Sequence, residues 1–509
     1  MNMECIITID LGTNAVRVMA FDIKGNVIAS TKGTYPTFHV EADYSEQDPE
    51  QIFITMLYVL KNFLTEKIHP KGFTVVSICF SASMHSLLMV DKSGVPMGNA
   101  ITWADNRGKK EAQELKNSEL GRQLYESTGT PIHPMSPLVK VTWLGRNDRE
   151  RFKKTSKFLS IKSYVLQQLT SGYVLDYSLA SATGFFNNQK LQWEQAALDH
   201  AGIDAERLPE LVPVFHSPGK LRKEFQTSLG LKDTVKIMVG SSDGCLATLG
   251  GGVWDEGKAI ITVEDSGAVR TIGRHVIRDA NQRLFNYVLT QDCYVSGGPT
   301  NNGGVIFEWY AKQFGDFRNP FDIEHTIQHL IHEASDVPVG SLGLLFLPYL
   351  LGERAPIWNA NARGTFFGIN IKHEKQHFVR AVIEGILYEM YSIGKTLQEH
   401  RTINHLTVNG SFASIPLCAK IIADLFRMPV SIGKNPDSIA QGAYLLSATD
   451  MGIFNSLDEA ARTVVLSTTY SPNTNHHRSY QRYFSVFEKL STRLSAEFEE
   501  LSELQHEQP

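Results

Sequence analysis

A short turn near the start of the chain has the composition of a phosphate-binding loop. It comprises Asp10-Leu11-Gly12-Thr13-Asn14 and is followed by Arg17. Phosphate binding needs backbone amides that converge on an anion, and a small residue such as Gly12 lets the main chain come close. Asp10 would then hold Mg²⁺ through water, while Arg17 would contact phosphate oxygens. The same residues also suit a plain hairpin turn with a surface salt bridge, and the composition alone favours that simpler interpretation.

The sequence around this turn predicts an antiparallel strand meander. Residues 5–10 and 15–21 are strand candidates on either side of the turn, and a further turn at 22–26 leads into a third strand. A helix should follow over 49–68, because Asp48 can cap it and Pro49 suits its first position. In the second half of the chain we expect helices over 376–399, from 414, from 438 and over 480–504, and a strand at 406–408.

A weak internal repeat divides the chain into two halves. The pattern Ile6-Ile7-Thr8-Ile9-Asp10 with Ala15-Val16-Arg17 returns, one residue shorter, as Ile260-Ile261-Thr262-Val263-Glu264 with Ala268-Val269-Arg270. Two related α/β halves would explain the repeat, as would coincidence between two apolar strands. The stretch 240–257 contains six glycines. We therefore predict one domain over residues 1–249 and a second domain over residues 250–509.

The composition excludes several classes of protein. The 509 residues exceed one core and suggest two or three domains. A balance of 49 basic against 54 acidic residues argues against nucleic-acid binding, which usually needs a basic surplus. The apolar run 343–351 is too short to span a bilayer, and the N-terminus lacks the order of a signal peptide. The five scattered cysteines predict neither disulfides nor a zinc site. We expect a cytoplasmic protein with reduced, buried cysteines.

Several blocks of sequence together resemble the FGGY family of carbohydrate kinases. The similarity spans roughly residues 4 to 455, and the blocks keep the family's order. They are Asp10-Leu11-Gly12-Thr13 with Arg17, Ser83-Met84-His85-Ser86, Trp103-Ala104-Asp105-Asn106-Arg107, Asp176-Tyr177-Ser178-Leu179-Ala180-Ser181, Gly240-Ser241-Ser242-Asp243, Gly352-Glu353-Arg354-Ala355-Pro356 and Arg380-Ala381-Val382-Ile383-Glu384-Gly385. The resemblance implies an α/β fold of two actin-like, ribonuclease H-like ATPase domains that flank a catalytic cleft.

The resemblance also implies the reaction and its catalytic residue. An FGGY kinase transfers the γ-phosphoryl group of ATP, with Mg²⁺, to a hydroxyl of a small sugar-like molecule. Asp243 matches the family's catalytic base, which accepts the proton of the attacking hydroxyl. A carboxylate suits this role because phosphoryl transfer depends more on positioning and charge neutralisation than on a strong base. From the sequence alone, Asp243 could instead be a turn residue before Gly244.

The matching blocks assign further residues to the two substrates. On the sugar side the resemblance indicates Met84, His85, Trp103, Asp105 and Arg107, although without it His85 would be a loop histidine and Trp103 a core aromatic. For ATP it indicates Gly12, Thr13, Asn14, Arg17, Ser266, Gly267, Gly410, Ser411, Phe412 and Ala413. Residues 409–413 also suit an ordinary strand-to-helix connection.

The loops that vary with the sugar look most like those of gluconate kinases. These loops are residues 84–86, 103–107 and the stretch Pro299-Thr300-Asn301-Asn302-Gly303-Gly304. A gluconate pocket should supply donors for a carboxylate, and His85, Arg107, Asn301 and Asn302 are the candidates. Arg107 could also be structural, paired with Asp105. We expect gluconate as the substrate, with no nucleic-acid or membrane partner, and leave a homodimer open.

One block departs from the family's pattern. Glu264-Asp265-Ser266-Gly267 stands where the second phosphate motif normally reads Gly-Thr-Ser-Gly. A like charge about 4 Å from a phosphate costs about 4 kcal/mol at an effective dielectric of about 20, so both carboxylates must turn away, pair with arginine or help to hold Mg²⁺. This departure keeps two alternatives open: a kinase for xylulose or another sugar, and a nucleotide-binding regulator that has lost phosphoryl transfer.

Overall fold

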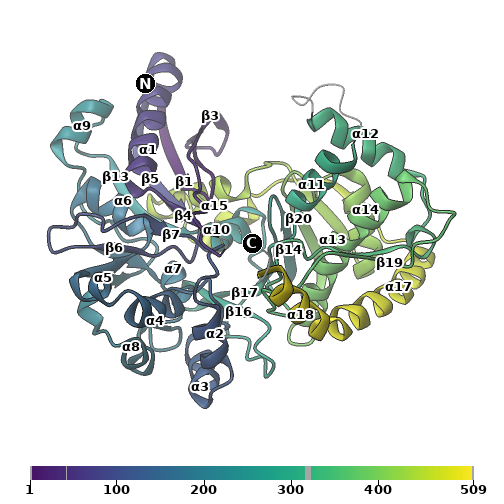
Figure 1. Ribbon diagram of the computed structural model, residues 1–509. Helices are drawn as coiled ribbons and strands as arrows, with labels where there is room; N and C mark the ends of the chain where they lie inside the picture. Colours follow the sequence, from purple (N-terminus) through teal and green to yellow (C-terminus); the bar gives the residue numbers. More distant parts are fainter. Residues whose placement is uncertain (1–2, 42, 316–322, 507–509) are drawn as a thin grey trace. The chain divides into compact units, whose positions relative to one another are not determined.

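The chain forms two compact units. The computed structural model describes residues 3–41, 43–315 and 323–506. The first unit comprises Met1–Trp254, Gly273–Ser296 and Asp437–Val464. The second unit comprises Asp255–Ile272, Gly297–Pro436 and Val465–Pro509. Each unit is of mixed α/β structure (Figure 1), and two segments from later in the chain complete the first unit.

The first unit contains a five-stranded sheet in the order β13-β5-β1-β2-β3. Strands β1 (Met3–Leu11), β2 (Ala15–Asp22) and β3 (Val27–Thr34) form the predicted antiparallel meander, while β5 (Phe73–Ala82) and β13 (Lys236–Ser242) extend it in parallel. Because the side chains of β1 are buried from Cys5 to Leu11, this strand lies in the core of the sheet.

Three helices of the first unit position its functional residues. Helix α1 (Pro49–Phe63) begins as predicted, since the Asp48 side chain accepts hydrogen bonds from two backbone amides and proline fills the first turn. Helices α10 (Asp243–Gly250) and α15 (Ser438–Asp450) lie backbone to backbone. A Cβ atom on Gly442 would lie 2.1 Å from the Leu246 carbonyl oxygen, so only glycine permits this approach. Gly442 therefore serves the packing of these two helices.

The remaining elements of the first unit are shorter. The helices are α2 (Lys109–Lys116), α3 (Glu119–Thr128), α4 (Pro137–Asn147), α5 (Arg149–Lys154), α6 (Ile161–Thr170), α7 (Tyr177–Ser181), α8 (Gln195–Ala201), α9 (Lys223–Leu229) and α16 (Leu457–Arg462). The strands are β4 (Glu46–Gln47), β6 (Leu88–Val90), β7 (Ala100–Ile101), β8 (Lys157–Leu159), β9 (Val174–Asp176), β10 (Phe186–Asn187), β11 (Gln192–Trp193), β12 (Glu210–Val212) and β16 (Phe285–Thr290). Strand β17 (Cys293–Thr300) begins in the first unit and ends in the second.

The second unit opens with the same strand arrangement as the first. Strands β14 (Gly257–Val263) and β15 (Gly267–Gly273) form an antiparallel hairpin, and β14 pairs in parallel with β20 (Ile403–Asn409). In the first unit β1 is likewise antiparallel to β2 and parallel to β5. The repeat in the sequence therefore corresponds to two hairpins with the same strand pairing. Strands β21 (Val430–Gly433) and β22 (Leu466–Tyr470) continue the sheet.

The helices of the second unit include those predicted from 376 and from 414, whereas the single helix predicted over 480–504 is wrong, because the tail begins at Thr474 and breaks at Leu494 into two helices. The helices are α11 (Gly304–Phe314), α12 (Ile323–Ser335), α13 (Lys375–Gln398), α14 (Pro416–Phe426), α17 (Thr474–Arg493) and α18 (Ser495–His506), with the short strands β18 (Leu345–Leu347) and β19 (Thr365–Phe367). Helix α13 is buried over most of its length, and its Arg380 donates to Glu384 at 2.7 Å and to the hydroxyl of Tyr480 on α17 at 2.8 Å.

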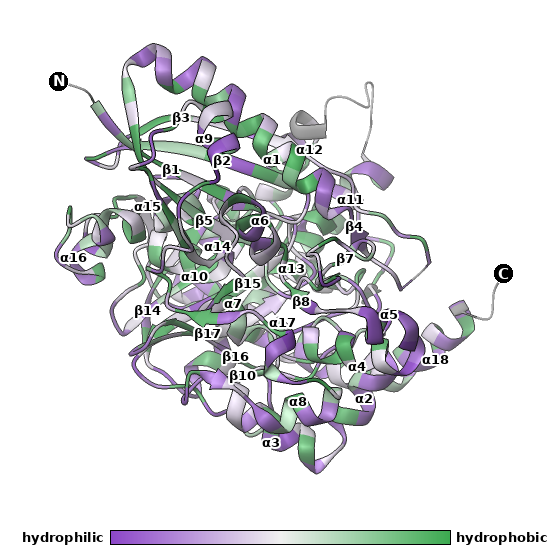
Figure 2. Cartoon of the chain, turned by 90° about the vertical axis from the view of Figure 1, so that its left-hand side faces the viewer, coloured by the Kyte–Doolittle hydropathy of each residue, from purple (hydrophilic) through white to green (hydrophobic). Residues whose placement is uncertain are grey.

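The distribution of polarity agrees with two water-exposed α/β units. Figure 2 shows the short helix α5 largely hydrophilic, as its sequence RERFKK requires. All five cysteines are buried, as expected. Within the described ranges, no helix combines the length and the hydrophobicity that a membrane span needs.

Candidate active site

The predicted phosphate loop joins β1 to β2 in the first unit. The Gly12 amide donates to the Ala15 carbonyl at 3.0 Å, which closes the turn. The indole nitrogen of Trp103 donates to the Thr13 hydroxyl at 2.9 Å. Asn14 is exposed at the tip of the loop. The structure thus brings the predicted phosphate loop into contact with a residue predicted to bind the sugar.

Asp10 lies at the end of β1 with an unmatched carboxylate oxygen. It is 6 % exposed, and its Oδ1 atom has no hydrogen-bond partner among the described residues. Burial raises the pKa of Asp10 to about 7; Arg17, opposite it in the hairpin, opposes the rise, whereas the charges of Asp243 and Asp437 add to it. A buried carboxyl with a spare oxygen and acidic neighbours is the electrostatic setting of a cation site.

A cavity of about 340 Å³ lies over this carboxyl within the first unit. Asp10, Arg17, Lys32, Ser81 and Asp437 supply its polar lining. The Ser81 hydroxyl is also buried without a hydrogen-bond partner in the described part of the chain. Oxygen ligands are those that Mg²⁺ prefers, and cationic side chains suit phosphate. The residues present therefore fit a metal ion with a phosphate group.

Asp437 was not predicted for this site. Its side chain accepts a hydrogen bond from the Ala440 amide at 2.9 Å and so caps α15. An aspartate just before a helix is an ordinary cap in a sequence. Only the return of residues 437–464 to the first unit brings Asp437 near Asp10.

Asp243 occupies the first position of α10, directly after β13. It is half-buried, and its Oδ1 atom accepts a hydrogen bond from the Gly244 amide at 2.6 Å. The Ser242 hydroxyl caps the helix by accepting from the Cys245 amide at 3.4 Å. A helix N-terminus favours negative charge, so the fold supports Asp243 as a carboxylate.

A buried network fixes the strand end that precedes Asp243. Lys162 pairs with Asp176 at 2.6 Å, and its ammonium group donates to the Ser241 carbonyl at 3.1 Å. The Ser178 hydroxyl accepts hydrogen bonds at 2.7 Å from the Ser241 hydroxyl and from the Ser242 amide. The block at 176–181 therefore supports β13 rather than facing a ligand, a role that its sequence alone did not reveal.

His85 lies in a loop with an unusual backbone conformation. Its φ is +69°, a value that residues other than glycine seldom adopt. The Nδ1 atom lies 2.8 Å from the Ala182 carbonyl, and the Nε2 atom lies 3.5 Å from the Tyr287 hydroxyl. Met84 beside it is buried. Backbone strain of this kind clusters at functional sites, which agrees with the role predicted for His85.

Asp105 and Arg107 are bonded to each other. Arg107 donates to Asp105 at 2.9 and 2.7 Å and to Glu46 at 2.6 Å, and its guanidinium lies 3.8 Å from the centre of the Tyr44 ring. Asp105, which is 0 % exposed, also accepts from the Ser45 amide at 2.7 Å. This is the structural pairing that the sequence left open for Arg107, because two carboxylates accept from its Nε and Nη2 atoms.

Asn301 and Asn302 follow β17 in the second unit. The side chain of Asn302 is fully buried and donates to the Gly352 carbonyl at 2.7 Å and to Glu353 at 2.9 Å. A substrate contact through this amide nitrogen would require one of these bonds to break. The Asn301 amide donates to the Leu351 carbonyl at 2.9 Å, while its Oδ1 atom has no partner among the described residues. Asn301 is thus the better placed of the two to meet a hydroxyl donor.

The predicted nucleotide loop follows β20 in the second unit. Gly410 has a φ of +97°, and a Cβ atom there would lie 2.3 Å from the Val263 carbonyl oxygen, so this position requires glycine. Phe412 is buried against Phe307 and Ala413 is buried beside it. The Asn409 side chain is also buried, yet neither of its amide atoms has a partner in the described part of the chain. Asn409, the first residue of the predicted motif 409–413, thus offers an unmatched amide at the start of the loop.

The two unexpected carboxylates turn towards solvent. Glu264 and Asp265 are exposed in the turn between β14 and β15, next to Ser266 and ahead of the buried Gly267. Glu264 accepts a hydrogen bond from the Ser411 hydroxyl at 3.1 Å. Glu264 lies outside the strand pairing, whereas Asp10 lies within it, so the hairpin does not place Glu264 where Asp10 stands.

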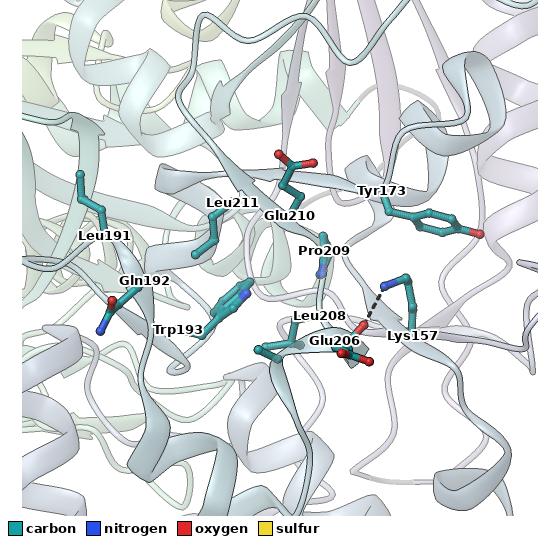
Figure 3. A pocket seen from close by; sticks show the side chains of 11 residues that line it. Lys157, Tyr173, Leu191, Gln192, Trp193, Glu206, Leu208, Pro209, Glu210 and Leu211 are labelled. Atoms are coloured by element: carbon teal, nitrogen blue, oxygen red, sulfur yellow. Dashed lines mark hydrogen bonds between the residues drawn. The ribbon is translucent and has the colours of Figure 1, made fainter.

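A more open pocket of about 590 Å³ lies elsewhere in the first unit. Figure 3 shows Trp193 and Tyr173 on its walls, with Lys157 donating a hydrogen bond to the Glu206 carbonyl. No residue for which the sequence predicted a role lines this pocket. The candidate site is therefore the smaller cavity over Asp10.

Two family models match this chain. The N-terminal domain of the FGGY family of carbohydrate kinases matches residues 5–250, and the C-terminal domain of that family matches residues 265–451. The chain belongs to the FGGY family of carbohydrate kinases. This FGGY chain is 33 % identical over 508 residues to the gluconokinase of Bacillus subtilis (strain 168), covering 98 % of this chain and 97 % of the relative.

Solved structures of the family extend the comparison. The crystal structure of gluconate kinase from Lactobacillus acidophilus superposes with a TM-score of 0.91 at 33 % identity, covering 98 % of this chain and 100 % of the other. The structure of ligand-bound xylulose kinase from the same organism gives the same values. The fold is the two-domain FGGY kinase fold of actin-like type, and the chain is a carbohydrate kinase of this family.

Proposed function

We propose that this carbohydrate kinase transfers the γ-phosphoryl group of ATP to a hydroxyl of gluconate in the presence of Mg²⁺. The observation that carries the proposal is the Asp10 carboxyl, which is buried with an unmatched oxygen in the cavity that Arg17 and Lys32 also line. Structural roles for a buried carboxyl use its oxygens in hydrogen bonds, so an unmatched one suggests a missing ligand. The similarity to the Bacillus subtilis gluconokinase supports the choice of sugar.

Asp243 is the proposed general base. It lies at the first position of α10, and its carboxylate would accept the proton of the sugar hydroxyl as that oxygen approaches the γ-phosphorus. Arg17 and the amides of Thr13 and Asn14 would bind phosphate oxygens and hold them in line. When bound, Mg²⁺ neutralises charge on the phosphates, and Asp10 would hold it through water.

ATP and the sugar are proposed to use the remaining predicted residues. In the second unit, Ser266, Gly267 and residues 410–413 would contact the nucleotide, and the unmatched amide of Asn409 supports a ligand there. In the first unit, His85 and Trp103 would contact the sugar. Met84 shapes the His85 loop, while Asp105 and Arg107 would support the site through their mutual bonds.

A second candidate substrate is xylulose. The occupied guanidinium of Arg107 favours it, because a gluconate carboxylate would lose the donor that best matches its shape. The xylulose kinase of Lactobacillus acidophilus matches this chain as well as the gluconate kinase does. Gluconate remains the first choice because the substrate loops look most like those of gluconate kinases.

A substrate panel tests the proposal. We expect purified enzyme with MgATP to release ADP at least about tenfold faster, in kcat/KM, with gluconate than with xylulose, ribulose or glycerol, a difference of about 1.4 kcal/mol. A coupled ADP-release assay measures this directly. Preference for xylulose would replace gluconate with the second candidate. Release of ADP at the same basal rate with every sugar would contradict kinase activity and favour a nucleotide-binding regulator.

A further inference from the structure

A buried lysine connects the two loops proposed to bind the sugar. Lys140 on α4 is 0 % exposed. Its ammonium group donates to the His85 carbonyl at 2.6 Å and to the Thr102 carbonyl at 2.7 Å. His85 belongs to one loop, and Thr102 directly precedes Trp103 in the other. One side chain therefore bonds both segments, beside the backbone bridge in which Leu87 and Ile101 exchange hydrogen bonds at 2.9 and 2.8 Å.

Packing alone does not explain a lysine at this position. Burial lowers the pKa of Lys140 to about 7, with Asp105 opposing this change and Arg107 adding to it. Apolar residues of similar volume usually replace buried charges at little cost in stability. An ammonium group, however, carries three donors on one atom, so it can bind two converging carbonyls at once, which an apolar side chain cannot do.

In both loops the lysine bond acts on the main chain next to a side chain that is itself held by another contact. At His85 the backbone has a positive φ, and the ring nitrogen lies within hydrogen-bond distance of the Ala182 carbonyl. The Lys140 bond holds the main-chain carbonyl of the same residue. In the other loop the Thr102 carbonyl also accepts the Asp105 amide at 3.3 Å, which closes the turn that presents Trp103. Loss of the ammonium group would remove one hydrogen bond from each turn, while the Leu87–Ile101 bridge would still hold the segments side by side.

We propose that Lys140 is a positioning residue for the sugar, because its ammonium group holds His85 and Trp103 at the separation that the substrate requires. The inference rests on the proposed function, which assigns these two side chains to the sugar. Lys140 itself is buried behind the loops and touches main-chain atoms of each.

The test compares Lys140→Met, which keeps the volume, with Lys140→Gln, which keeps an N–H donor. For the sugar that the wild-type enzyme phosphorylates best, we expect Lys140→Met to raise KM and the calorimetric Kd about 10- to 100-fold, the scale of a misplacement near 1 Å. The constants for ATP should change by less than about twofold. Lys140→Gln should bind the sugar better than Lys140→Met, whereas a residue that only fills space would show the opposite order.

Val141→Ala is the matched control. Val141 is also fully buried on α4, and its truncation leaves a cavity that lowers stability without removing the lysine bonds to either loop. We expect this variant to keep the sugar KM of the wild type. Hydrogen–deuterium exchange of residues 83–86 and 102–107 should rise in Lys140→Met and stay unchanged in Val141→Ala, which tests the loops even where activity is low.

The outcomes separate the inference from the proposed function. Wild-type sugar affinity in Lys140→Met, or unchanged exchange in both loops, overturns the positioning role while the kinase assignment stands. A wild-type enzyme that phosphorylates none of the sugars overturns the proposed function first. A parallel loss of affinity in Val141→Ala would show that general destabilisation, rather than the ammonium group, affects the site.

Discussion

Asp243→Asn is expected to lower kcat by about 10²- to 10⁴-fold, the range for loss of a general base. Asparagine keeps the size and the hydrogen bond to the Gly244 amide but cannot accept the proton of the sugar hydroxyl. Since the variant still offers the phosphate loop and the nucleotide loop, its Kd for MgATP should stay within about threefold of the wild type. Steady-state kinetics and calorimetry measure the two quantities.

The control for this variant is Asp233→Asn. Asp233 is exposed on the surface of the same unit and lies 3.9 Å from the exposed Lys220, so its charge should not affect turnover. Near-normal kcat in Asp243→Asn would remove the base assignment. Loss of ATP affinity together with kcat would instead indicate that Asp243 mainly holds the metal and the nucleotide.

Local patterns in the sequence predicted much of the fold. The meander at residues 5–34, the capped helix after Asp48 and the hairpin at 257–273 all follow from alternation, caps and turns between neighbouring residues. The repeat also indicated two hairpins built alike. These features depend on interactions over a few residues, which is why a single sequence reveals them.

Local patterns did not predict which distant segments of the chain pack back against the first unit. Residues 437–464 join the first unit, and no local pattern marks that return. Asp437 was therefore missed, since from the sequence it is only the cap of α15. Lys140 and Lys162 were missed because a helical lysine is usually exposed, and only the packed core shows that their ammonium groups bind main-chain carbonyls.

Candidate ligands were predicted better than their actual bonding. The hairpin pairs Asp10 with Arg17, as the phosphate-loop interpretation required. For Arg107 the sequence could not decide between a substrate and Asp105, because the deciding partners, Glu46 and Tyr44, come from a separate segment. Residue types thus indicated which groups could bind a ligand. Tertiary contacts decide which of these groups still have donor or acceptor atoms without a partner in the protein.

Asp10→Asn is expected to make the protein more stable at pH 8 while it weakens metal binding. Burial raises the pKa of Asp10 from its ordinary value of 3.8 to about 7, so between these pH values the folded state binds more protons than the unfolded state. Wild-type stability must then fall as the pH rises from about 4 to about 7. Asparagine does not ionise and so avoids this loss of folding stability. The loss is at most about 4 kcal/mol and reaches its full size above pH 7.

Unfolding in urea with a metal chelator, followed from pH 5 to pH 8, measures this difference. The gain of Asp10→Asn over the wild type should grow with pH, and Asp233→Asn should show no such trend. Added Mg²⁺ should stabilise the wild type at pH 8 and have little effect on Asp10→Asn. A variant that is less stable than the wild type at every pH would mean that Asp10 is needed for folding. A stabilised variant with poor catalysis would mean that the buried charge of Asp10 lowers folding stability but is needed to bind a cation and a phosphate.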